Sequence, residues 1–133
     1  MTDEGEEVGM SFNNAERHND EILDLFDRQG LLEEADKFSA QAYQSFPWVP
    51  AFKGTRGIVL VELGELDKGI VLLKQAMKEN EETRSKAIDA AYLAIAEGRK
   101  GNFECAKQYL DIAIQFDATC SLIERAQNEL LHA

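Results

Sequence analysis

Residues 101–113, with the sequence GNFECAKQYLDIA, contain the pattern that decides the fold. Gly101 is followed at fixed distances by an apolar residue, a small residue and then an alanine. The same order follows two earlier glycines, Gly30 and Gly64, and the three glycines are 34 and 37 residues apart. The residues two, five and twelve positions after each glycine are Leu32, Ala35 and Ala42, then Leu66, Gly69 and Ala76, then Phe103, Ala106 and Ala113. A period of this length indicates repeated supersecondary units.

The spacing within each unit predicts two helices joined by a tight turn. A glycine between two helical patterns permits the positive φ that ends the first helix. Apolar residues before and after the glycines recur at steps of three or four, as in Leu66, Ile70, Leu73 and Met77. No segment alternates apolar and polar residues over the length of a strand. The sequence therefore predicts an all-α fold in which small residues let neighbouring helices pack closely.

The expected helices cover residues 13–29, 32–45, 50–63, 66–79, 85–100 and 103–116, in three pairs. Pro47 and Pro50 interrupt the pattern between the first two pairs, and Pro50 suits the first turn of a helix. Residues 80–84 form a lengthened turn. A capping box of Ser121 with Glu124 predicts a last helix over residues 121–132, which covers the end of the third repeat. Residues 1–11 form an acidic, disordered leader, and residues 12–133 form one domain.

These residues resemble the tetratricopeptide repeat (TPR) family. The period, the glycine and the alanine twelve residues later match the family pattern, and Pro47 stands where the family places its closing proline. The resemblance covers about residues 15–118, with repeats at about 16–47, 50–83 and 87–118. It implies an α-α superhelix, a TPR solenoid of three helix-turn-helix repeats, followed here by the capping helix. It also implies a non-catalytic interaction module that binds a partner segment in a concave groove.

The resemblance places twelve residues in that groove, four from the first helix of each repeat. They are Arg17, Asp20, Asp24 and Asp27; Ala51, Gly54, Ile58 and Val61; and Ile88, Ala91, Ile95 and Gly98. The three aspartates form an acidic stripe at helical spacing, and the other two thirds are apolar and small. Such a groove suits a basic or amphipathic partner peptide or helix.

Each part of this groove has an alternative interpretation. The aspartates can be an ordinary solvated face. Ile58, Val61, Ile88 and Ile95 can be core residues packed between adjacent helices. Trp48 either packs over the junction of the first two repeats or, if exposed, is a candidate binding hot spot.

The charge is concentrated at one end of the chain, whose 133 residues carry a formal net charge of -11. Residues 1–36 hold 12 acidic and 2 basic residues, whereas residues 37–133 hold 13 and 12. A chain of this charge is a poor ligand for nucleic acid, whose phosphates are bound by Lys and Arg. No apolar run has the roughly 18–20 residues of a membrane-spanning helix. We expect a soluble cytoplasmic protein that has no nucleic-acid partner and does not insert into membranes.

No catalytic, cofactor or metal motif is present in the sequence. His18 and His132 have no ligand spacing around them, and Cys105 and Cys120 have neither a CxxC spacing nor a nearby His. Both cysteines are expected to be apolar fillers, with a Cys105–Cys120 disulfide as the open alternative. Nucleotide-binding and hydrolase motifs are missing as well. An enzyme, a cofactor and a metal site are therefore not expected.

Three functions remain open. The first is a TPR adaptor or scaffold that binds a partner in its groove. The second is a structural domain that self-associates, for example as a homodimer, or docks onto the rest of a larger protein. The third is a small acidic chaperone, which the chain resembles in size, charge and repeat number.

Overall fold

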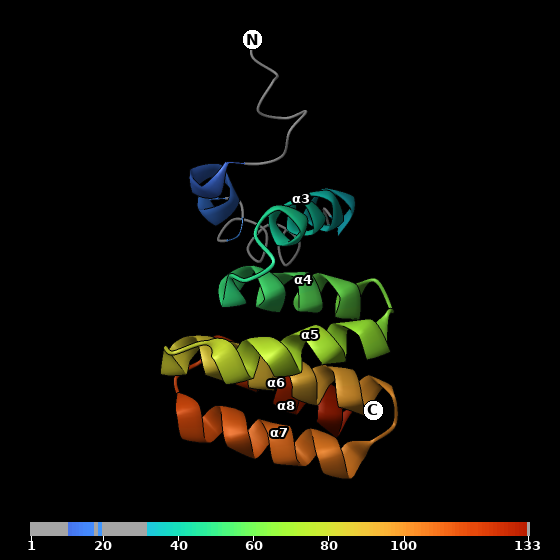
Figure 1. Cartoon of the computed structure of the whole chain (residues 1–133). Coiled ribbons are helices and arrows are strands. Elements are labelled where there is room, and N and C mark those ends of the chain that lie inside the picture. Colours follow the sequence, from blue (N-terminus) through green and yellow to red (C-terminus); the bar gives the residue numbers. More distant parts are fainter. Residues whose placement is uncertain (1–10, 18, 20–31, 133) are drawn as a thin grey trace.

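The computed structural model describes residues 11–17, 19 and 32–132, and within these ranges the chain is helical with no strand. Residues 12–17 are helical, and longer helices follow (Figure 1). These are α3 (Leu32–Ser45), α4 (Pro50–Glu62), α5 (Leu66–Glu79), α6 (Thr83–Arg99), α7 (Phe103–Phe116) and α8 (Ser121–Leu131). The predicted all-α class is confirmed for this part of the chain. The helix predicted over residues 13–29 lies mostly outside the described residues, as do the leader and Gly30.

The turns α4–α5 and α6–α7 have the same structure, as the repeated glycine predicts. Gly64 and Gly101 have φ values of 88° and 87°. In each turn the amide of the residue after the glycine donates to a carbonyl five residues earlier, Glu65 to Leu60 and Asn102 to Glu97, both at 2.9 Å. These bonds satisfy carbonyls that the end of a helix leaves open. The prediction of a positive-φ glycine turn is confirmed at both positions.

Two predicted boundaries need correction. The lengthened turn at residues 80–84 is shorter, because α6 already begins at Thr83 and the amide of Lys86 donates to the carbonyl of Glu82. The capping box is wrong, because Ser121 is itself the first helical residue and no side chain caps α8. Pro50 does occupy the first turn of α4, as expected.

The helices form successive layers from α3 to α7, and α8 packs against both α6 and α7 (Figure 1). The main core lies where α4, α5 and α6 meet. Its largest fully buried side chains include Ile58, Leu73, Tyr92, Leu93 and Ile95. Each layer therefore covers the apolar face of the one before it, as in a helical repeat protein.

The backbones of α4 and α5 meet at two glycines. A Cβ atom added to Gly69 would lie 2.7 Å from the carbonyl oxygen of Gly57 and 2.7 Å from Cγ2 of Val61. A Cβ atom on Gly57 would lie 3.0 Å from the carbonyl oxygen of Gly69 and 2.8 Å from Cγ of Leu73. No side chain fits at these contacts. The predicted role of the small residue five positions after the glycine is therefore confirmed in this pair.

Candidate functional site

The structure corrects the predicted apolar groove. Gly54, Ile58, Val61, Ala91 and Ile95 are buried, so their side chains or backbone do not form an open surface. The core alternative describes Ile58, Val61 and Ile95, since each belongs to the cluster shared by α4, α5 and α6. The physical reason is that adjacent helices pack directly against each other along this face.

The remaining residues of the predicted groove differ in how far they are exposed to solvent. Arg17 and Ala51 are exposed, while Ile88 and Gly98 are half-buried. Arg17 donates to Asn14 at 2.8 Å. The acidic stripe of Asp20, Asp24 and Asp27 lies outside the described residues, so it stays a prediction.

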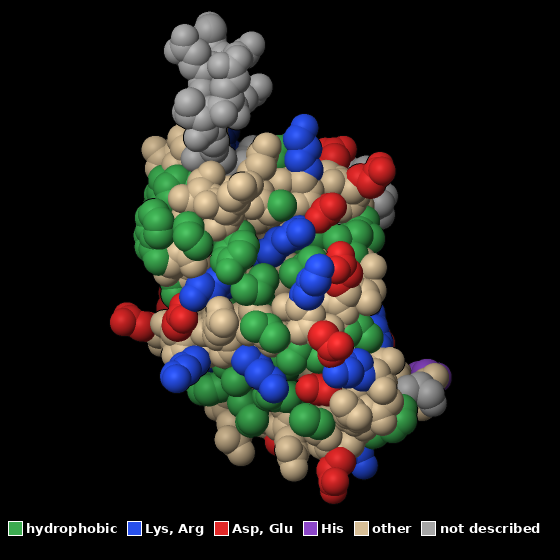
Figure 2. All heavy atoms as spheres, turned by 45° about the vertical axis from the view of Figure 1, so that its right-hand side comes forward, with side chains coloured by type: hydrophobic (Ala, Val, Ile, Leu, Met, Phe, Trp, Pro, Cys, Tyr) green, Lys and Arg blue, Asp and Glu red, His purple; other side chains and the backbone are tan. Residues whose placement is uncertain are grey.

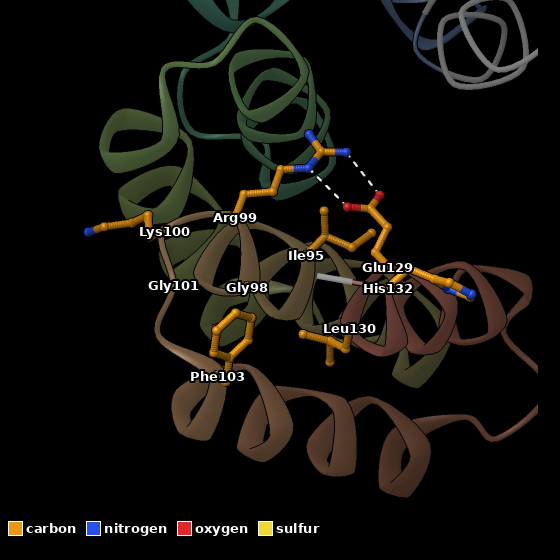
Figure 3. Close-up of a pocket in the computed structure, with 9 residues that line it drawn as sticks. All are labelled: Ile95, Gly98, Arg99, Lys100, Gly101, Phe103, Glu129, Leu130 and His132. Carbon is orange, nitrogen blue, oxygen red and sulfur yellow. Dashed lines mark hydrogen bonds and ion pairs between the residues drawn. The ribbon is translucent and has the colours of Figure 1, made fainter.

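A pocket of about 600 Å³ lies where α6, the α6–α7 turn and α8 meet (Figure 3). Two of the predicted groove residues, Ile95 and Gly98, line it. Phe103 and Leu130 extend toward each other in this hollow from α7 and α8 (Figure 3). The remaining lining residues are Arg99, Lys100, Gly101, Glu129 and His132. Its lining thus combines three apolar side chains with four charged or polar ones, which makes it a candidate ligand site.

The apolar part of the pocket is open to solvent. Phe103 is 45% exposed although it belongs to a repeat position that is apolar throughout. Leu130 packs directly on Gly98, because a Cβ atom at Gly98 would lie 2.8 Å from Cδ2 of Leu130. Phe103 and the half-buried Leu130 are therefore the apolar side chains of this lining that another molecule can contact.

Charged groups border the pocket in pairs. Arg99 forms a two-pronged contact with Glu129, with Nε–Oε1 at 3.1 Å and Nη2–Oε2 at 2.9 Å (Figure 3). Lys100 pairs with the exposed carboxylate of Asp67. The pKa values of Arg99 and Lys100 are raised: burial opposes the shift at Arg99, and the carboxylates favour it at both residues. The cations on this border therefore stay charged.

Arg99 also belongs to a polar network that links α4, α6 and α8. Arg99 Nη1 lies 3.2 Å from Oε1 of Glu62. The hydroxyl of Tyr92 donates to Oε2 of Glu62 at 2.7 Å, and Arg125 Nη2 donates to the same oxygen at 2.7 Å. Burial raises the pKa of Glu62, but the hydrogen bond from Tyr92 and the charges of Arg125 and Arg99 outweigh it and lower the pKa overall. The carboxylate of Glu62 is thus ionised and held by partners from two other helices.

A second buried carboxylate is in the opposite situation. Asp89 is 3% exposed, and its Oδ2 accepts a hydrogen bond from Nδ2 of Asn80 at 2.9 Å. Its Oδ1 lies so close to α4 that a Cβ atom on Gly54 would be 2.7 Å away. Burial raises the pKa of Asp89 to about 7, against the opposing effects of Asn80 and the charge of Lys86. Asp89 is therefore largely protonated below neutral pH.

An exposed aromatic group lies near the other end of the described chain. Trp48, in the turn between α3 and α4, is 69% exposed and meets the ring of Phe46 edge-on, with centroids 6.0 Å apart. Phe46 also contacts Phe12 and Phe52, and Phe12 is itself 43% exposed. The prediction that Trp48 packs over the repeat junction is wrong; the hot-spot alternative fits its exposure.

Other reactive groups form no site in the described part of the chain. Cys105 and Cys120 are free thiols, one near each end of α7, so the disulfide alternative is wrong. Their separation follows from the rise of about 1.5 Å per residue along the helix between them. No group of His, Cys, Asp and Glu among the described residues is arranged to hold a metal ion. His18 lies outside these residues, and Nδ1 of His132 contacts the carbonyl of Asn128.

The surface between these features is mixed. On the face shown in Figure 2, small groups of hydrophobic side chains lie among lysines, arginines and carboxylates. Within the described ranges, no helix is both long enough and apolar enough to cross a membrane.

Sequence reasoning missed most of the pocket. The repeat register had placed Ile95 and Gly98 in the groove. Arg99, however, lies on α6, whereas Glu129, 30 residues later, and Leu130 lie on α8. The polar network around Glu62 also joins residues that are far apart in the sequence, since Glu62 and Arg125 are 63 residues apart. Phe103, a large apolar residue at a repeated position where a helix starts, was a further signal in the sequence. No protein-family model, curated protein or solved structure matches this chain.

Proposed function

We propose that this chain is a non-catalytic protein-interaction module of the TPR type. Two kinds of observation support this proposal. The sequence repeats one register three times, and the two repeats that the structure describes have equivalent glycine turns. Such repeats stack so that each unit covers its neighbour, and they offer surfaces rather than reactive groups to other molecules.

The observation that carries the proposal is the pocket at α6, α7 and α8. Its lining includes Gly98, a half-buried residue of the expected groove, and the exposed ring of Phe103. The partner in this proposal is a protein segment that inserts an apolar or aromatic side chain between Phe103 and Leu130. Its polar groups face the Arg99–Glu129 pair on the border. An anchor residue in a pocket with a polar rim is the usual energetic centre of a protein interface.

Indole, the side-chain group of tryptophan, is a suitable probe. We expect saturable NMR shifts at the amides of Gly98 and Gly101 and at the methyl groups of Leu130. Phe103→Ser removes one wall of the pocket and should weaken binding at least about tenfold, in keeping with the loss of one apolar contact face.

Val71→Ser is the matched control, because Val71 is exposed on α5 and does not line the pocket. It should leave indole binding unchanged. Shifts that are absent, or that map to α5 and survive Phe103→Ser, would contradict this site. A circular dichroism spectrum equal to that of the parent chain shows that each variant is folded.

A further inference from the structure

The last turn of α5 is held by two polar side chains of α6, Lys86 and Asp89. Nζ of Lys86 donates to the carbonyl oxygen of Met77 at 2.7 Å and lies 3.5 Å from that of Lys78. Oδ2 of Asp89 accepts a hydrogen bond from Nδ2 of Asn80, the residue that ends α5, at 2.9 Å. Residues three apart lie on the same face of a helix, so both side chains reach the same turn of α5.

Lys86 also joins this turn to α7, since α6 packs against both α5 and α7 (Figure 1). Its Nζ lies 5.7 Å from the centroid of the ring of Phe116, the last residue of α7. Carbonyls at the C-terminus of a helix carry partial negative charge, so an ammonium group near them is stabilising. A cation over an aromatic ring is favourable as well. One ammonium group thus connects the ends of α5 and α7.

Asp89 has surroundings that suit a neutral carboxyl group. It is 3% exposed, and its hydrogen bond comes from the neutral amide of Asn80. Its other oxygen, Oδ1, faces Gly54 of α4 so closely that a Cβ atom there would be 2.7 Å away. An ionised carboxylate in such a place needs a cation or water beside it. The packing against Gly54 and Asn80 therefore fits the protonated form.

Two cations of the neighbouring turns can respond when Asp89 ionises. Lys86 is three residues away on α6, and Lys53 flanks Gly54 on α4. Lys53 is already paired with a carboxylate, that of Glu79 on α5, at 2.7 Å. Lys86 instead contacts neutral carbonyl groups and an aromatic ring. Because a hydrogen bond to an ionised acceptor is about twice as strong as one to a neutral acceptor, Lys86 gains more from a new carboxylate.

We propose that Lys86 and Asp89 form a pH-sensitive switch between α5, α6 and α7. In the closed state Asp89 is neutral and Lys86 contacts the carbonyl of Met77 and the ring of Phe116. When Asp89 releases its proton to water, the ammonium group of Lys86 leaves these two contacts and turns to the carboxylate. The last turn of α5 then loses its cation, and the end of α7 loses its contact with Lys86.

The raised pKa of Asp89 supports a change near neutral pH. Burial raises this pKa to about 7, although the hydrogen bond from Asn80 and the charge of Lys86 oppose the rise. The closed state should therefore dominate below this pH and the open state above it. The switch differs from a general loss of stability, since the chain stays folded and the change is confined to the contacts of one side chain.

The experiment follows the full chain by NMR from about pH 5 to about pH 9, on both sides of the pKa of Asp89. The carboxyl carbon of Asp89 reports its ionisation, and the ring protons of Phe116 report the position of Lys86. Both signals should change with one midpoint near pH 7. The nuclear Overhauser effect between the Hε protons of Lys86 and the Phe116 ring should be lost above that midpoint.

Three variants separate the switch from other effects of pH. Asp89→Asn cannot ionise, so its Phe116 signals should keep their low-pH positions throughout. Lys86→Met keeps an apolar stem without the charge, so Phe116 should not respond, although Asp89 still ionises with a raised midpoint. Lys53→Met is the matched control, because it removes the other cation and should leave the Phe116 response in place. Amide spectra that resemble those of the parent chain show that each variant is folded.

A Phe116 signal that stays constant while Asp89 ionises would overturn the switch. A response that persists in Lys86→Met, or that is lost in Lys53→Met, would overturn it too, because Lys86 would then not be the group that moves. An Asp89 that keeps one protonation state over the whole pH range would have the same consequence.

Discussion

The helix pairs α4–α5 and α6–α7 follow the same register but pack in different ways. In α4–α5 the two small positions are Gly57 and Gly69, and the backbones meet directly. In α6–α7 the same positions are Ala94 and Ala106, which are fully buried and fill the contact with methyl groups. The first pair is therefore closed by backbone contact, while the second ends beside an open pocket that Gly98, Phe103 and Leu130 line.

The junctions around the two pairs differ as well. Asp89 of α6 occupies the register position that Phe52 occupies in α4, so a carboxyl group facing Gly54 stands where the preceding repeat has an aromatic ring. The junction with α8 instead contains the ionised network of Glu62, Arg99 and Glu129. The same register thus gives a tight α4–α6 junction that contains a protonated acid, and a junction with α8 that is held by ion pairs. The difference teaches that small residues fix where helices meet, but not how closely.

The largest expected effect is at the closed pair. Gly69→Ala places a methyl group 2.7 Å from the carbonyl oxygen of Gly57, so a backbone must move. We expect a loss of about 3 kcal/mol in the free energy of unfolding, measured with urea. The matched change in the other pair, Ala106→Gly, should cost only about 1 kcal/mol, mainly through helix propensity. Equal losses in the two variants would show that the pairs are packed alike.

The second effect concerns Asp89 and depends on pH. Its pKa is about 7 in the folded chain and 3.8 ordinarily, so between these values the folded state binds more protons than the unfolded state. Stability should therefore fall as pH rises from about 4 to about 7 and level off above that range. Asp89→Asn keeps a hydrogen-bond acceptor for Asn80 and cannot ionise. We expect it to be about 2 kcal/mol more stable than the parent at pH 8 and equal at pH 4.

A parent chain and Asp89→Asn with parallel stability curves would contradict this account of the junction. The protonation of Asp89 can be followed separately through its side-chain carbonyl signal in NMR. The midpoint of that signal should lie near pH 7 in the folded protein.

The third effect concerns Glu62, whose contribution to stability depends on pH with the opposite sign to that of Asp89. The pKa of Glu62 is lowered in the folded chain, so its contribution is present above the ordinary value of 4.5 and is lost as pH falls through the folded value. Glu62→Gln should cost about 1.5 kcal/mol at pH 7, because it leaves Arg99 and Arg125 without one carboxylate. The difference should be smaller at pH 3, which lies below the ordinary value of 4.5. Unfolding by urea at both pH values tests this, with the solvent-exposed Glu65→Gln as a control.

The smallest effect is one in which the two pairs should agree. Gly64→Ala and Gly101→Ala each force a positive φ on alanine, and no atom lies within 4 Å of either new Cβ. We expect a similar loss of about 1 kcal/mol for both, measured as the shift in the midpoint of thermal unfolding. A clear difference between them would show that the turns are strained in different ways.

The register predicted much of the described fold because it depends on local chemistry. The glycines, Pro50 and the apolar spacing determine where helices begin and end, and predicted ends at residues 62–66 and 99–103 differ from those observed by one residue at most. The capping box failed because Ser121 joined the helix instead of preceding it. The surface was less predictable. The exposure of Ile58 or Phe103 depends on neighbouring layers, and no spacing within one helix contains that information.

The network around Glu62 has a consequence for how the chain unfolds. A stack of repeats behaves almost as a one-dimensional array, in which the terminal unit frays independently of distant ones. Here Arg125 of α8 reaches across Tyr92 of α6 to bond Glu62 of α4, a loop of 63 residues. Closing such a loop costs entropy that is recovered only when both ends are in place. Opening of α8 is thus coupled to the middle of the stack, and its amides should exchange hydrogen together with those of α4 rather than ahead of them.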